Sequence, residues 1–206
     1  MLLNSPVRRL LGGAAVLFLS VTAALGDPLI TKSYGYFDIG GKTAEDLDKQ
    51  LERLGPLTKS SGHRHPGATE IGFGGEVTYV ERGGRCSVGS AKVTLKTHII
   101  LPRWSNRRRA ETDLRFIWDT LSSDIKRHEE RHAEIARSYA RTLERELLGL
   151  RPAGNCGELE KQVAATTERV LEAHDREQLR FDKVESKNFD ARMMRLLKYR
   201  MQQKDG

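Results

Sequence analysis

Hydrophobic and polar positions follow two different periods along the chain. Before residue 102, β-branched and aromatic residues partly alternate with polar ones in three runs: "YGYFDI" (34–39), "EIGFGGEVTYVE" (70–81) and "SAKVTLKTHIILP" (90–102). Such alternation is typical of strands with one buried face. The turn residues Gly83 and Gly84 separate the last two runs, which predicts that these strands pair in antiparallel fashion.

Helical patterns account for most of the remaining chain. Thr43 is a typical N-terminal cap, and it predicts a short helix that ends at Gly55-Pro56. After Pro102 glycine becomes rare, and apolar residues recur every three or four positions from about 110 to 148 and from about 157 to 199. The segment "GLRPAGNCG" separates these two long helices. The fold class is therefore expected to be α+β: a small antiparallel β-sheet with one short helix, followed by two long antiparallel α-helices.

The first 26 residues have the character of a signal peptide. Arg8 and Arg9 precede an apolar run, and the small residues before Asp27 suit signal peptidase. The run is short for a transmembrane helix and is interrupted by Gly12 and Gly13. We therefore expect cleavage, no stable membrane span afterwards, and a periplasmic or secreted protein.

Export changes the interpretation of the cysteines. The chain has only two, Cys86 and Cys156. Because two thiols in an oxidising compartment usually form a bridge, we predict a Cys86–Cys156 disulfide. It would close a loop that contains the whole segment "HEERH" (128–132).

The positive charge of the chain does not by itself identify a partner. The formal net charge is +7, and arginines cluster in "RWSNRRR" (103–109). Basic clusters can bind nucleic acid, but most are solvated surfaces. An exported protein meets little duplex DNA, and no basic stripe is interleaved with aromatic residues. Nucleic acid is therefore not an expected partner.

The segment "HEERH" offers candidate chemistry on the first long helix. His128 and His132 fill the gap in the apolar stripe between Ile125 and Ile135, so both imidazoles are expected on one helix face, one turn apart. Two histidines spaced i and i+4 can bind one zinc ion. Glu129 lies about 100° around the helix, where a general base would stand. The alternative is a charged helix that contains this motif by chance.

A catalytic zinc site needs a third protein ligand and an open position. On the second long helix His174 lies on the apolar stripe, and Glu185 lies near the edge of that stripe. The helix pattern alone therefore favours His174, with Glu185 as a further candidate.

Several segments resemble a bacterial family of unknown function whose members are predicted to be secreted zinc-dependent proteases. The matching pieces are "YFDIGGKTAEDLDKQLERLGP", the strand pair ending in "HIILPRW", "FIWDTLSSDIKRHEERH", "NCGELE" and "HDREQLRFD". The family also carries a late motif, Y-D-x-x-T-x-H-G. Here Phe181-Asp182 matches its start, whereas Glu185, Lys187 and Asn188 stand in place of its Thr, His and Gly. The resemblance favours Asp182 as the third ligand, with His174 and Glu185 as alternatives.

Residues and resemblance together predict a single zincin-like domain over residues 27–206, with a β-rich half (27–102) and a helical half (110–200). The expected function is a zinc-dependent metallopeptidase that hydrolyses peptide bonds in peptide or protein substrates, with zinc as cofactor and Glu129 as general base. The alternative is a non-catalytic envelope protein or pseudoenzyme with a structural or vacant metal site. The sequence outlines no specificity pocket.

Overall fold

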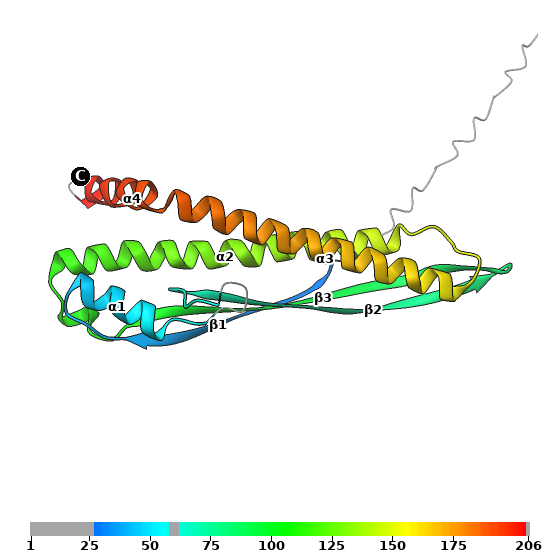
Figure 1. Ribbon diagram of the computed structural model, residues 1–206, viewed down its shortest axis with the longest axis horizontal. Coiled ribbons are helices and arrows are strands. Elements are labelled where there is room, and N and C mark those ends of the chain that lie inside the picture. Colours follow the sequence, from blue (N-terminus) through cyan, green and yellow to red (C-terminus); the bar gives the residue numbers. More distant parts are fainter. Residues whose placement is uncertain (1–26, 58–61, 205–206) are drawn as a thin grey trace, which may run out of the picture.

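The structure is a computed structural model that describes residues 27–57 and 62–204. The predicted signal peptide (1–26) lies outside the described residues. The strands β1 (Leu29–Ile39), β2 (Ala68–Arg82) and β3 (Arg85–Trp104) form one sheet in the order β1-β3-β2. Figure 1 shows this sheet as a long ribbon, with α2 running alongside it and α3 returning next to α2. The α+β class is confirmed.

The direction of β1 corrects one detail of the predicted sheet. β2 and β3 pair in antiparallel fashion, as predicted, but β1 runs parallel to β3, with Leu29 opposite Thr94 and Ile39 opposite Trp104. The sheet is therefore mixed and not wholly antiparallel. The reason lies in where β2 begins: after α1 (Ala44–Leu54) the chain re-enters the sheet at the end toward which β1 runs, since Ala68 and Gly35 both lie opposite Ile100. β2 must then run opposite to β1, and the turn at Gly83-Gly84 reverses the chain once more.

The short helix α1 forms as its sequence predicts. The Thr43 hydroxyl accepts a hydrogen bond from the Asp46 backbone N–H at 3.1 Å, and the Asp46 carboxylate accepts one from the Thr43 N–H at 3.2 Å. This reciprocal pair satisfies two N–H groups at the start of the helix. Leu47 and Leu51 are buried in a small core together with Ile39, Trp104 and Trp118. This core fixes α1 beside the N-terminal half of α2.

Three further helices follow the sheet and a short 3-10 turn (Arg107–Arg109). α2 (Thr112–Leu148) packs Ala136, Ala140 and Leu143 on the strand residues Val93 and Leu95. α3 (Cys156–Lys187) runs antiparallel to α2, and α4 (Phe189–Lys204) continues beyond it (Figure 1).

The second long helix was predicted from about 157 to 199, but the structure divides this stretch into the two helices α3 and α4. Asn188 ends α3: its backbone N–H reaches the carbonyls of Val184 and Glu185 at 3.2 Å, and its side-chain amide donates to the Val184 carbonyl at 2.8 Å. Asparagine competes in this way with helical hydrogen bonding. The apolar spacing continues through this break, so the spacing alone could not reveal it.

The predicted disulfide is present and ties the sheet to the helices. Cys86, at the start of β3, is bonded to Cys156, the first residue of α3, and their Cα atoms lie 5.0 Å apart. Cys86 and Ala153 also exchange two backbone hydrogen bonds of 3.0 and 2.9 Å. The turn between α2 and α3 is thus held against the β2–β3 hairpin. Within residues 27–57 and 62–204, no helix has the length and apolar character needed to span a bilayer.

Candidate metal centre

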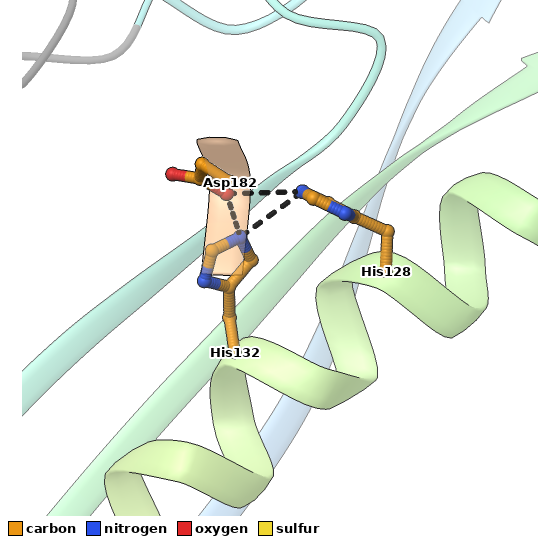
Figure 2. A group of neighbouring side chains, drawn as sticks. All are labelled: His128, His132 and Asp182. Atoms are coloured by element: carbon orange, nitrogen blue, oxygen red, sulfur yellow. Dashed lines mark hydrogen bonds and ion pairs between the residues drawn. The ribbon is translucent and has the colours of Figure 1, made fainter. Parts of the chain in front are cut away.

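Two histidines of α2 and one aspartate of α3 direct donor atoms at a common point. His128 Nε2 lies 3.1 Å from His132 Nε2, and Asp182 Oδ1 lies 2.9 Å from His132 Nε2 and 3.4 Å from His128 Nε2. Figure 2 shows the three side chains pointing toward one another. Their donor atoms all lie within 4.8 Å of one another, and this group could hold a metal ion.

The distances suit a small cation bound between the three side chains. A tetrahedral zinc ion with bonds of about 2.1 Å separates its donor atoms by roughly 3.4 Å. The three observed separations, 2.9 to 3.4 Å, need only a slight expansion to reach that value. Two imidazoles and one carboxylate are also a ligand set typical of catalytic zinc.

Gln178 determines which nitrogen of His132 carries a proton. Its side-chain amide donates to the backbone carbonyl of His132 at 3.2 Å, which directs the amide oxygen to His132 Nδ1 at 2.6 Å. Because that oxygen can only accept, Nδ1 must carry the proton. In the neutral ring Nε2 then presents a lone pair to the Asp182 carboxylate. Two acceptors at 2.9 Å repel each other unless a proton or a metal ion lies between them.

The pKa shifts of His132 and Asp182 show that the site favours a positive charge beside the carboxylate. Burial alone would lower the pKa of His132, but hydrogen bonds to Asp182 and Gln178 and the Asp182 charge together raise it. Burial alone would raise the pKa of Asp182, but the contacts with His128 and His132 hold it well below its usual range. The site therefore stabilises an anionic carboxylate beside a cation.

Glu129 lies next to this group and faces the protein interior. Its side chain is only 5% exposed, and Thr69 Oγ1 of β2 lies 2.9 Å from both Oε2 and the backbone carbonyl of Glu129. Burial raises the pKa of Glu129, and the nearby charges of His132 and His128 oppose that rise. The carboxylate is thus more deeply buried than the part-exposed histidines, whereas the helix pattern placed the histidines on the buried stripe.

The comparison with family models assigns most of the chain to one family. Residues 34–189 match the model of DUF922, described as a bacterial protein of unknown function. The chain belongs to the DUF922 family. The matched residues include His128, Glu129, His132 and Asp182. No curated protein and no solved structure matches the chain significantly.

The structure of this DUF922 chain does not bring His174 into the three-donor group. His174 is 5% exposed, its Nδ1 donates to Asp175 at 2.9 Å, and its Nε2 accepts from the Gln178 amide at 2.8 Å. Its ring also meets Phe73 and Tyr139 edge-on. His174 therefore supports Gln178, which in turn orients His132.

Glu185, the other alternative, belongs to a charged cluster beside the site. It lies 3.7 Å from His128 Nδ1, too far for a hydrogen bond, and pairs with Arg127 and with Arg192. Arg192 of α4 also binds the buried Asp124 of α2 through contacts of 3.0 to 3.2 Å. This cluster fixes α4 and the end of α3 to the helical turn that precedes His128. Arg192 lies beyond the residues that match the DUF922 model.

The two residues between Glu129 and His132 face away from the donors. Glu130 accepts hydrogen bonds from Lys32 and Tyr34 of β1, and Arg131 pairs with Glu134 at 2.9 Å. Their charges are therefore satisfied at the surface and do not compete for the metal centre.

Sequence reasoning missed Gln178 and Thr69. Gln178 has a recognisable signal, because His174, Gln178 and Asp182 follow one another at intervals of four residues and so share one face of α3. Thr69 has no such signal, since only the packing of β2 on α2 places it against Glu129.

Proposed function

We propose that this DUF922 protein is a periplasmic or secreted zinc-dependent metallopeptidase. The observation that carries the proposal is the convergence of His128, His132 and Asp182 beside the buried carboxylate of Glu129. A ligand set with two histidines and one carboxylate leaves one position of a tetrahedral zinc ion open for chemistry.

The positions of these groups support a chemical role for each of them. A zinc ion held by the three donors would lower the pKa of a water and polarise the scissile carbonyl. With zinc bound, Glu129 would accept the proton released by that water and would pass it to the departing amine. Its burial raises its pKa, which brings a carboxylate closer to the range in which it can both accept and donate a proton near neutral pH. Thr69 holds the carboxylate in place through Oε2.

The substrate is proposed to be a peptide or protein of the cell envelope or its surroundings, and not nucleic acid. A disulfide is typical of oxidising compartments outside the cytoplasm, and the Cys86–Cys156 bridge supports such a location. The signal-peptide pattern of residues 1–26 supports export by the same argument.

A second candidate function is a metal-binding envelope protein without peptidase activity. Lys187 and Asn188 stand where the late family motif has its His and Gly, and this departure favours the alternative. The two functions differ in whether Glu129 is needed for a reaction.

A comparison of Glu129→Gln with wild type separates them. The amide cannot accept a proton, so the variant should keep its zinc and lose hydrolysis of a fluorescent casein substrate by at least a hundredfold. Glu130→Gln is the matched control, because Glu130 is the neighbouring glutamate and faces Lys32 and Tyr34; it should retain activity. Equal activity of Glu129→Gln and wild type at equal zinc content would refute the peptidase function.

A further inference from the structure

An apolar groove lies beside the metal centre, between α1, the N-terminal half of α2 and the start of α4. Its volume is about 430 Å³, within the roughly 300–1,000 Å³ range of ligand pockets. The walls are mostly apolar and include Ala44, Ile117, Trp118, Ile125, Phe189 and Met193. Ile117 and Phe189 are 42% and 39% exposed, so the groove opens to solvent.

The groove and the metal centre share a wall. Arg64 and Pro66 line the groove, and Gly67 follows them directly in the chain. A Cβ atom on Gly67 would lie 2.9 Å from the Ile125 side chain and 3.0 Å from Glu129 Oε1, so the backbone here touches both sites. Ile125 stands four residues before Glu129 on α2, which corresponds to about 6 Å along the helix axis. A chain bound across the metal centre could therefore place a neighbouring side chain in the groove.

The rim of the groove carries an excess of negative charge. Asp48 and Glu52 line it from one face of α1, four residues apart, and both are exposed. Arg64 is the cation on the groove wall, and its guanidinium is engaged with the Gly55 carbonyl at 2.7 Å. The rim thus favours a cationic group next to whatever apolar group enters the groove.

We infer that this groove is the specificity site for the substrate, and that it takes a bulky apolar side chain that is followed or preceded by Lys or Arg. The inference rests on the proposed peptidase function, because it assumes that a peptide crosses the metal centre. Burial of an apolar side chain against Ile117, Trp118 and Met193 supplies the binding free energy. The carboxylates of Asp48 and Glu52 select the neighbouring charge.

The tryptophans allow binding to be measured without hydrolysis. The chain has two tryptophans, and Trp118 lines the groove. The ring of Trp104 lies 5.8 Å from the ring of Trp118, measured between ring centres. The zinc-loaded Glu129→Gln protein is titrated with short peptides that contain Phe-Lys, Phe-Glu or Ser-Lys, and tryptophan fluorescence is followed. Phe-Lys peptides should bind at least tenfold more tightly than either of the others.

Variants show whether the groove is responsible. Ile117→Asp places a charge on the groove wall and should weaken Phe-Lys binding at least tenfold. Ala44→Phe fills the groove from the exposed start of α1 and should have the same effect without adding charge. Val184→Asp is the matched control, because Val184 is 49% exposed on α3 and does not line the groove; its affinity should equal that of the parent.

The possible results separate the two proposals. Equal binding of the three peptides, or unchanged binding in both groove variants, overturns the specificity site even if the wild type hydrolyses peptides. If Phe-Lys peptides bind with the expected preference but the wild type hydrolyses no peptide, the groove is supported as a peptide site. In that case only the proposed peptidase function is contradicted.

Discussion

Replacing Gln178 by leucine tests how the metal centre is oriented. Leucine keeps much of the side-chain volume but removes the hydrogen bonds to His132 Nδ1 (2.6 Å), the His132 carbonyl (3.2 Å) and His174 Nε2 (2.8 Å). His132 can then rotate or take the other tautomer, with its proton on the nitrogen that faces Asp182. Loss of such a supporting contact typically weakens metal binding 10- to 100-fold, which corresponds to about 1.4 to 2.7 kcal/mol.

The assay is a competition for zinc between the protein and a chromophoric chelator at pH 7.5. Gln162→Leu is the matched control, since it makes the same substitution at an exposed position of α3; its affinity should equal that of wild type. If Gln178→Leu also binds zinc as tightly as wild type, Gln178 does not orient His132 and the argument for the His132 tautomer is wrong.

Other predictions concern stability and pH. The Cys86→Ser/Cys156→Ser double variant should lose about 4 kcal/mol of unfolding free energy in urea, because the bridge spans 70 residues; a loss below about 1 kcal/mol would contradict this. Arg192→Met leaves the buried Asp124 with Arg127 as its remaining partner and should cost about 2 kcal/mol; an unchanged midpoint would refute the role of this ion pair. In the metal-free protein folding raises the pKa of His132. Protonated His132 therefore contributes its full stabilisation below the unfolded pKa near 6.5, and this stabilisation is lost as the pH rises through the pKa of the folded protein. Zinc affinity should change in the opposite direction and increase over that same pH interval, because the metal competes with the proton; parallel trends in urea unfolding and zinc titration would contradict the assignment.

Local patterns allowed much of the fold to be predicted. The capped helix α1, the antiparallel β2–β3 pair and the disulfide depend on neighbouring residues or on a single pair of cysteines, and each is confirmed. The direction of β1 depends on the path of the chain through α1, which no strand pattern encodes. The break at Asn188 depends on one side chain that competes with the helix backbone.

In the metal centre, the two donors on α2 could be predicted from local sequence, whereas the donor on α3 could not. His128 and His132 lie one turn apart on one helix, so helical periodicity predicts that they share a face. Which residue of α3 lies beside these histidines depends on the register in which α3 packs along α2. His174 and Asp182 stand eight residues apart on the same face, about 12 Å along the axis, and either could face the histidines in an isolated helix. The disulfide at the first residue of α3 and the turn before it fix the position that places Asp182 beside His132.

The zinc content of the purified protein after removal of residues 1–26 tests the central claim most directly. Wild type dialysed against zinc and then against buffer should retain one equivalent by mass spectrometry of the metal. His132→Ala, which removes one of the three converging donors, should retain far less than one. Retention of no zinc by the wild type, or of equal zinc by both proteins, would contradict a metal centre formed by His128, His132 and Asp182.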